Sequence, residues 1–406
     1  MMKEKEMKRV PKLRFPEFTD DWEQRKLDEV VERITRKNEN LESTLPLTIS
    51  AQYGLIDQNE FFDKRIASKD VSGYYLIRKG EFAYNKSTSS DAPWGAIKRL
   101  DRYENGVLST LYIVFKILDE DKTSSDYLAT YYSTELWHKG VQAIAAEGAR
   151  NHGLLNITPA DFFKTDLMLP TNISEQQKIG AYFKQLDHLI TLHQRKLEKL
   201  KELRKGVMKK LFSQEVRFKA DDGSEFPDWE EKKLGDDVQF INGRAYKQDE
   251  LLNSGKYLVL RVGNLFTNDS YYYSDLELDN DKYIENGDLI YAWSATFGPR
   301  IYYGEKCIYH YHIWKLKFDE NIISKIFLNY YLLYDVEKIK SQRTGGTMVH
   351  ITKNAMEHRE LQFPCLAEQQ KIADCLSTLD DVIEKQKETL AAWEELKKGL
   401  LQQMFV

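Results

Sequence analysis

Two stretches of this chain are copies of one another: EQQKIGAYFKQLDHLITLHQRKLEKLKELRKGVMKKLF, residues 175–212, and EQQKIADCLSTLDDVIEKQKETLAAWEELKKGLLQQMF, residues 368–405. They align without a gap at an offset of 193, and they share the opening Glu-Gln-Gln-Lys-Ile, the Leu-Asp pair and the closing Phe. An internal repeat sets the architecture of a chain. This one predicts a protein built from two similar halves, each ending in the same kind of segment.

Each copy has the apolar spacing of a long helix. In the first copy, Ile179, Phe183, Leu186 and Ile190 follow one another at steps of four, three and four residues, which is a heptad pattern. No proline occurs in 171–226 or after residue 364, and proline is the residue that interrupts helices. The pattern therefore predicts two long helices that need a partner to bury their apolar seams.

Each seam is interrupted near its middle by a polar residue, His193 in the first copy and Gln386 in the second. If the helices lie antiparallel in full register, residues i and j face each other where i + j is about 580, since 175 + 405 = 580. His193 then lies near Gln386. Because a polar step in an apolar seam can define register, we predict that this pair sets the helix-pair register, although both side chains can equally point to solvent.

The segments before the helices are variable and differ between the halves. They contain β-rich runs at 108–118 and 308–318 among Gly- and Asn-bearing turns, which indicates α/β domains. The fold class predicted is α+β: two α/β domains separated by two long antiparallel, coiled-coil-like helices, in a pseudo-twofold tandem duplication. The predicted boundaries are 1–170 for domain 1, 171–214 for the first helix, 215–364 for domain 2 and 365–406 for the second helix.

Composition excludes several classes of protein. The 406 residues are 42% hydrophobic and carry a net charge of -5, so bulk charge gives no support to nucleic-acid binding and any such binding depends on local patches. No uninterrupted apolar run is long enough to span a bilayer, and the N-terminal segment has no apolar signal-peptide region. The three cysteines form no CxxC pair. We expect a cytoplasmic protein with no membrane association.

The chain contains no catalytic motif that we recognise. GxxxxGK[ST] and GxGxxG are both missing, and no Ser/His/Asp or Cys/His arrangement has a familiar spacing. His310 and His312 share one face of a strand, but a zinc site needs about four ligands and no cysteine pair accompanies them. We therefore expect no catalytic residue, no metal site and no cofactor bound by this chain.

Binding residues are expected in two loops of each half, 79–99 with 147–153 and 286–300 with 342–348. Their Arg and Asn side chains suit base edges, and their Ser, Thr and Lys side chains suit phosphates. The alternative is that they are ordinary polar hairpin tips. The candidate DNA-binding residues are Tyr84, Asn85, Lys86, Ser87, Thr88, Arg150, Asn151 and His152 in the first half, and Tyr291, Trp293, Ser294, Thr296, Arg300, Arg343, Thr344 and Thr347 in the second.

Short motifs recur in the same order in both halves. They are Phe-Pro-Asp-Trp-Glu at 226–230 with a looser form at 15–23, Gly-[Glu/Asp]-Φ-x-Tyr at 80–84 and 287–291, Glu-Gln-Gln-Lys-Ile at 175–179 and 368–372, and Leu-Asp-x-x-Ile at 186–190 and 379–383. Over nearly the whole chain this order resembles the specificity subunit of type I restriction-modification systems.

The resemblance implies a DNA-recognition subunit that is not itself an enzyme. In that family, each of two target-recognition domains binds one half of an asymmetric bipartite duplex DNA site, and the helices set the spacing and dock the partners. Those partners are two modification (methyltransferase) subunits, which bind S-adenosylmethionine and methylate adenine N6. Restriction subunits with translocase and nuclease activity use ATP and Mg. The expected cofactors therefore belong to the partner subunits.

Two other interpretations remain open from the sequence. One is a fragment of a single-chain restriction-methylation enzyme, which needs a cofactor loop and a catalytic tetrapeptide. The other is a coiled-coil scaffold without a nucleic-acid role, which does not require two divergent α/β segments at the same place in each repeat.

Overall fold

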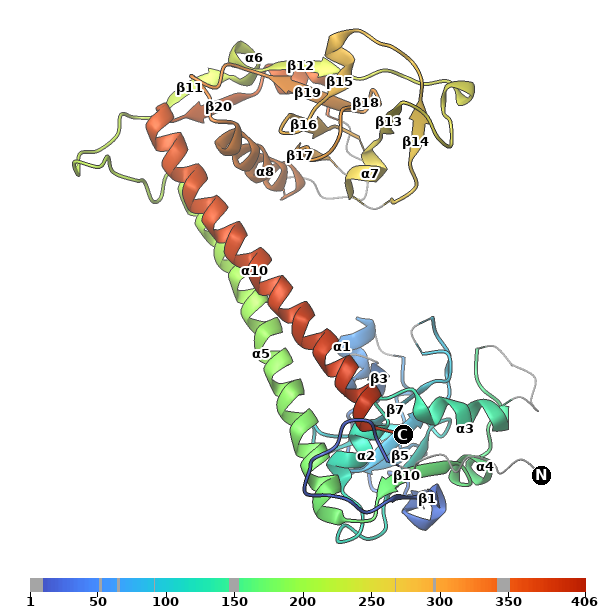
Figure 1. Ribbon diagram of the computed structural model, residues 1–406. Helices are drawn as coiled ribbons and strands as arrows, with labels where there is room; N and C mark the ends of the chain where they lie inside the picture. Colours follow the sequence, from blue (N-terminus) through green and yellow to red (C-terminus); the bar gives the residue numbers. More distant parts are fainter. Residues whose placement is uncertain are drawn as a thin grey trace. The chain divides into compact units, whose positions relative to one another are not determined.

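The computed structural model describes residues 10–50, 53–63, 66–90, 92–145, 153–266, 268–294, 297–341 and 351–406. It divides into two compact units: unit 1 comprises Met1–Gln194 and Glu388–Val406, and unit 2 comprises Arg195–Lys387. The two long helices are α5 (Ile173–Phe212) and α10 (Leu366–Met404) (Figure 1). Each is divided between the units, so the compact units differ from the four segments that the sequence suggests.

The sheet at the centre of unit 1 has four antiparallel strands in the order β2-β9-β6-β7. Three strand pairs accompany it, β1 with β10, β3 with β4, and β5 with β8. The strands are β1 (Trp22–Lys26), β2 (Val31–Ile34), β3 (Leu47–Ser50), β4 (Gly54–Asp57), β5 (Tyr75–Arg78), β6 (Phe82–Asn85), β7 (Ala96–Arg99), β8 (Asn105–Leu108), β9 (Ile113–Ile117) and β10 (Asp166–Pro170). The short helices are η1 (Leu27–Glu29), α1 (Gln58–Phe62), α2 (Ser125–Tyr131), α3 (Leu136–Ala145) and α4 (Pro159–Phe163).

Unit 2 repeats this plan with a second four-stranded sheet. Its sheets have the orders β12-β19-β16-β17 and β14-β13-β18-β15, and β11 pairs with β20. The strands are β11 (Glu230–Lys233), β12 (Gln239–Asn242), β13 (Tyr257–Leu260), β14 (Tyr272–Ser274), β15 (Tyr283–Ile284), β16 (Leu289–Ala292), β17 (Gly298–Ile301), β18 (Cys307–Tyr309), β19 (Ile313–Lys317) and β20 (Glu360–Phe363). The helices are α6 (Leu234–Asp237), η2 (Gln248–Glu250), α7 (Val262–Phe266), η3 (Asn280–Lys282), α8 (Lys325–Ser341) and α9 (Lys353–Glu357).

Matching strands pair in the same way in the two units. In unit 1, β6 runs antiparallel to β9 with Tyr84 opposite Ile113, and in unit 2, β16 runs antiparallel to β19 with Tyr291 opposite Trp314. Antiparallel neighbours place the end of one strand beside the start of the other. The residues after β6 and before β9 therefore share one end of their sheet, as do the residues after β16 and before β19.

Each core is completed by an aromatic residue at the end of a long helix. Phe405, just after α10, is buried in unit 1, where its ring lies 5.5 Å from Tyr127 and 6.1 Å from Trp22. Phe212, at the end of α5, is buried in unit 2 and stacks on Tyr331 at 4.9 Å. Both cores therefore combine a variable domain with the last turns of a helix that begins in the other unit.

The glutamate that opens each repeat is buried and fully partnered. Glu175 accepts from the Arg14 guanidinium at 2.7 and 2.8 Å and from the Trp22 indole at 3.3 Å. Glu368 accepts from Arg217 at 3.1 and 2.8 Å and from the Trp229 indole at 3.1 Å. A buried carboxylate is tolerated only when it is paired. This contact explains why the Trp and Glu motifs recur together in both halves.

The glutamine that follows joins the same helix start to a second loop. The Gln176 side chain accepts from Ser124 N at 2.9 Å and donates to Pro170 O, and Gln369 makes the matching bonds with Ser324 N and Pro364 O. The motif thus satisfies backbone groups that would otherwise be buried without partners. Its role is structural, since it ties each domain to the helix that follows it.

Replacing Glu368 with Ala should destabilise unit 2 by about 3–5 kcal/mol, because it leaves the Arg217 guanidinium and the Trp229 indole without their buried acceptor. Denaturant unfolding of the full chain measures the change. Lys371→Ala is the matched control from the same helix turn; its ion pair with Asp221 is exposed, and its loss should cost under about 1 kcal/mol. Equal losses for the two variants would show that the buried carboxylate is not the main link.

Candidate nucleic-acid interface

In domain 1, the residues that follow β6 are bonded to the described residues 153–155, at the end of the second predicted loop and just after it. Leu155 N donates to Lys86 O at 3.0 Å, and Thr88 N donates to Gly153 O at 2.8 Å. The Thr88 hydroxyl also donates to Gly153 O at 3.0 Å. The segment after β6 and the segment before α4 therefore form one surface, although they lie far apart in the chain.

Domain 2 joins the corresponding segments by a bond at a different position. Ile351 N donates to Trp293 O at 3.4 Å, and Trp293 corresponds to Lys86 at the offset of 207 that relates Trp22 to Trp229. Ile351 precedes the N-cap Thr352 of α9 directly, whereas Leu155 lies three residues before the N-cap Thr158 of α4, so the pairing of the two segments is repeated but the individual bond is not. A repeated backbone that carries different side chains can present two different binding surfaces.

Two predicted contact residues are core residues instead. Tyr84 and Tyr291 are both 0% exposed. Tyr84 stacks on Phe162 at 4.9 Å and donates to Trp94 O at 2.8 Å, and burial raises the pKa of its phenol well above the ordinary value. Burial, with a contribution from Asp335, likewise raises the pKa of Tyr291. The prediction that these tyrosines face a ligand is wrong, because both point into the core from a central strand.

The other predicted residues after β6 lie at the surface or partly at it. Asn85 and Lys86 are half-buried, and Ser87 is exposed. The Lys86 ammonium donates to Ile157 O at 3.1 Å, and desolvation lowers its pKa. Asn85 accepts from Ser87 N at 3.0 Å, which shapes the turn. Lys86 thus links the two loops, while the hydroxyls of Ser87 and Thr88 are placed toward the surface.

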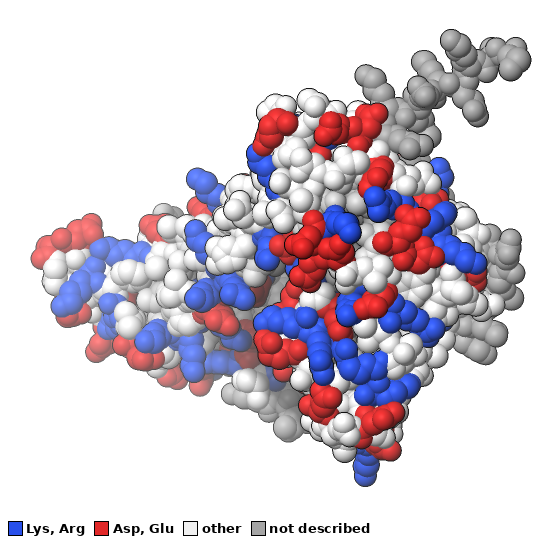
Figure 2. All heavy atoms as spheres, turned by 90° about the horizontal axis from the view of Figure 1, so that it is seen from below, with Lys and Arg blue, Asp and Glu red and all other residues white. Residues whose placement is uncertain are grey.

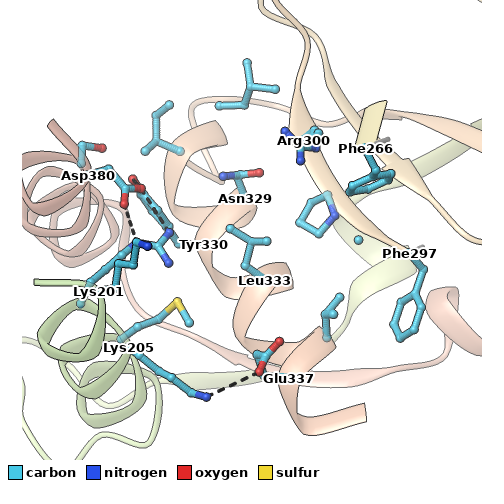
Figure 3. A pocket seen from close by; sticks show the side chains of 18 of the residues that line it. Lys201, Lys205, Phe266, Phe297, Arg300, Asn329, Tyr330, Leu333, Glu337 and Asp380 are labelled. Atoms are coloured by element: carbon cyan, nitrogen blue, oxygen red, sulfur yellow. Dashed lines mark hydrogen bonds and ion pairs between the residues drawn. The ribbon is translucent and has the colours of Figure 1, made fainter. Parts of the chain in front are cut away.

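The predicted residues after β16 take three different positions. Trp293 is partly exposed and its indole donates to Tyr311 O at 2.8 Å, whereas Ser294 is 7% exposed. Arg300 lies on β17 with its guanidinium 4.7 Å from the centre of the Phe266 ring (Figure 3). Arg300 and Trp293 therefore belong to different parts of the domain and do not form one contact surface.

The remaining predicted residues lie outside the part of the chain that the structure describes, so their positions stay predictions. They are Arg150, Asn151, His152, Thr296, Arg343, Thr344 and Thr347. All seven belong to the loops whose flanking residues are described above.

Arg300 borders a groove of about 870 Å³ in unit 2 (Figure 3). Helix α5 lines one side with Lys201, Arg204 and Lys205. Helix α8 lies in the middle, and Phe266, Phe297 and β17 line the opposite side (Figure 3). Its charges are largely paired: Arg204 with Asp380 at 2.5 Å and Lys205 with Glu337 at 4.0 Å. The groove therefore offers less free positive charge than its basic residues suggest.

An ion pair is repeated at equivalent positions of the two long helices. In unit 1, Lys397 contacts Asp187 at 2.5 Å, and in unit 2, Arg204 contacts Asp380 at 2.5 Å. These pairs are equivalent, since 187 + 193 = 380 and 204 + 193 = 397. Both have a residue sum of 584, and both carboxylates come from the Leu-Asp motif. The sequence analysis did not predict this ion pair between the helices. A signal was present, because the acidic residue recurs at 187 and 380 and the basic residue at 204 and 397.

The register therefore differs from the expected sum of 580. In unit 1, the His193 ring lies 6.1 Å from the Trp393 ring, and Gln194 donates to Glu394 at 3.3 Å, giving sums of 586 and 588. The His193 ring therefore lies beside an aromatic residue of its own unit, and its predicted proximity to Gln386 stays a prediction. Gln386 belongs to unit 2, where it is 6% exposed. Its role in the register stays a prediction.

A charge swap tests the repeated ion pair. Asp187→Lys or Lys397→Asp alone should lower the stability of unit 1 by about 0.5–1 kcal/mol, because each places like charges together on partly exposed helix faces. The double variant should recover most of that loss. Denaturant midpoints of the four proteins give the coupling energy directly. If the losses in unfolding free energy of the two single variants simply add up in the double variant, the coupling energy is zero and the pair contributes nothing to register.

The surface carries both signs of charge. Figure 2 shows Lys and Arg side chains intermixed with Asp and Glu over the visible face, in keeping with the net charge of -5. Within the described residues, no helix has the length and apolar composition needed to cross a bilayer. In the same part of the chain, no group of His, Cys, Asp and Glu side chains is arranged to hold a metal ion.

Comparison with known proteins gives one consistent result. A family model described as "Type I restriction modification DNA specificity domain" matches residues 19–202 and 227–392. The type I restriction enzyme MjaVIII specificity subunit of Methanocaldococcus jannaschii is 25% identical over 98% of this chain and 95% of its own length. The fold is similar to that of the type I restriction-modification S subunit from M. genitalium, with a TM-score of 0.56, 17% identity, and coverage of 98% of this chain and 99% of that one.

A second solved structure has the same fold. It comes from a study of complex assembly and conformational transition of the type I restriction-modification system, and it matches with a TM-score of 0.60 and 18% identity over 95% of this chain and 97% of that one. The family match covers both halves of the repeat and includes the loops, the domains and most of both long helices. The chain therefore belongs to the type I restriction-modification DNA specificity family, and it is a specificity subunit.

Proposed function

We propose that domain 1 and domain 2 each recognise one half of an asymmetric, bipartite site in duplex DNA. The observation that carries this proposal is that each domain ties the segment after a central strand to the segment before a short helix by a backbone hydrogen bond, Leu155 N to Lys86 O in one domain and Ile351 N to Trp293 O in the other. The same backbone framework thus holds different side chains in the two domains. Because base identity is discriminated by side chains at base edges, different side chains imply different half-sites.

The duplicated architecture fits duplex DNA. A chain with two similar halves has approximate twofold symmetry, which matches the approximate dyad of the DNA backbones. The long helices supply a spacer between the two readers, and we propose that they set the separation of the half-sites and dock the modification subunits. Net negative charge does not oppose this role, since partner subunits can supply cationic surface along the phosphates.

We propose that the chain is the non-catalytic member of its complex. Two modification subunits would bind S-adenosylmethionine and methylate adenine, with the target base flipped out of the stack. Restriction subunits would supply the translocase and nuclease activities that use ATP and Mg. The family membership and the lack of recognisable catalytic motifs in the sequence support this division of labour. Because the target is genomic DNA, we place the complex in the cytoplasm.

Domain exchange tests the proposal. Replacing residues 16–170 with the first domain of another family member should change one half of the methylated site and leave the other half and the spacer unchanged. The physical reason is that each domain has a core of its own, built with the start of one long helix and the end of the other, and the two cores share no residue. Methylome sequencing of cells that carry the exchanged chain and its modification subunits reports both halves together.

The outcomes separate the alternatives. A change in both halves would contradict independent recognition by the two domains. Methylation that stays at the original site in full would show that domain 1 does not contact the target bases. A scaffold without a nucleic-acid role predicts the second result, and the reciprocal exchange of domain 2 provides the matched control.

A further inference from the structure

A three-residue turn in domain 2 presents an aromatic ring beside the predicted loops. The turn His310–His312 joins β18 to β19. Its central residue, Tyr311, is 39% exposed, although Tyr309 before it and Ile313 after it are fully buried. An exposed ring between two buried anchors is held at a defined position on the surface.

The turn is fastened on both sides by backbone hydrogen bonds. Tyr311 N donates to Arg244 O at 3.1 Å, and Trp293 N donates to His312 O at 3.1 Å. The Trp293 indole also donates to Tyr311 O at 2.8 Å. Trp293 in turn accepts the bond from Ile351 that closes the predicted interface. The turn is therefore part of the same rigid framework as the two loops.

Neighbouring rings support the Tyr311 side chain. Its ring centre lies 4.0 Å from that of His312 and 4.4 Å from that of His310. Burial lowers the pKa of His310 to about 4, with further contributions from His312 and Arg261, so this imidazole is neutral near pH 7. A braced tyrosine offers a large contact area and loses little conformational entropy on binding.

Domain 1 has the same turn with other side chains. Tyr112 N donates to Ser109 O at 3.1 Å, as Ile313 N donates to His310 O at 3.0 Å. The first side chain of the turn accepts from the third residue in both domains: Leu111 N to Ser109 Oγ at 3.4 Å, and His312 N to His310 Nδ1 at 3.5 Å. The tip is Ser-Thr-Leu at 109–111 and His-Tyr-His at 310–312.

Strand pairing places both turns with the loops. The turn at 109–111 precedes β9 and the turn at 310–312 precedes β19, at the sheet ends where β6 and β16 finish. A repeated backbone with a changed tip is the same pattern that distinguishes the two loops between the domains. The tips include exposed apolar side chains, Leu111 at 57% and Tyr311 at 39%.

We infer that this turn is a third recognition element in each domain, and that it discriminates bases through apolar contact. Tyr311 would contact a base of the second half-site, and Thr110 and Leu111 would contact the first. The thymine methyl is the apolar group that a base pair shows in the major groove, and Thr and aromatic side chains are suited to it. This inference rests on the proposed function and adds residues that the two predicted loops do not contain.

The test compares Tyr311→Ala with the unmodified chain, each co-expressed with its modification subunits. Binding to a pool of duplexes randomised over both half-sites gives the base preference at every position. We expect Tyr311→Ala to reduce discrimination about tenfold at one or two adjacent positions of one half-site, and Tyr311→Phe to preserve it. Leu111→Ala should weaken preference in the other half-site only.

Tyr303→Ala is the matched control. Tyr303 is 75% exposed and follows the end of β17, which runs antiparallel to β16, so it lies at the opposite end of the sheet from the turn. It should leave every base preference unchanged. Thermal unfolding of each variant, compared with that of the unmodified chain, checks that the variant is folded.

Three results would overturn the inference. If Tyr311→Ala leaves every base preference unchanged, the turn has only a structural role. If it weakens binding equally for all sequences, Tyr311 contacts the sugar-phosphate backbone of the DNA and not a base. A loss in both half-sites would also exclude a local role. These results differ from those expected if the proposed function is wrong. In that case, the unmodified chain itself would show no preference for a bipartite site.

Discussion

A buried carboxylate at the start of each long helix is the contact on which the architecture depends. Glu175 and Glu368 are removed from water, and each is stabilised by one guanidinium and one indole from the first residues of its domain. Burying a charge without such partners would cost several kcal/mol, so the three groups must come together or not at all. The domain and its helix are therefore joined as one folding element, twice in the chain.

The helix ends impose a second constraint. Phe405 enters the aromatic core of unit 1 and Phe212 that of unit 2, so each unit includes the last turns of a helix that begins in the other. Unit 1 consequently contains the two parts of the chain most distant in sequence. The equivalent ion pairs, Asp187 with Lys397 and Asp380 with Arg204, join the two helices at matching positions inside each unit. Both the buried glutamate contact and the aromatic contact at the helix end occur once in each unit, as expected for a duplicated chain.

The two domains share their backbone arrangement but differ in the side chains at several equivalent positions. The strands, the helix starts and the turns at 109–111 and 310–312 are repeated, whereas side chains at equivalent positions differ: Lys86 against Trp293, and Thr110 against Tyr311. The repeated framework places these side chains at equivalent positions. Under the proposed function, their divergence is what makes the two half-sites differ.

Sequence alone determined the features that depend on local order. Heptad spacing and the distribution of proline predicted helices at 171–214 and 365–406, and the structure has Ile173–Phe212 and Leu366–Met404. Gapless repetition predicted the duplicated architecture, and the order of the short recurring motifs carried the resemblance to the family. Tertiary structure decided which of the predicted residues are exposed: Tyr84 and Tyr291 are core residues because the strands beside them and the helices over them cover that face. It also decided that His193 faces Trp393 and that the turn at 310–312 joins the loops, since contacts between distant segments depend on strand pairing and helix register, which no local pattern encodes.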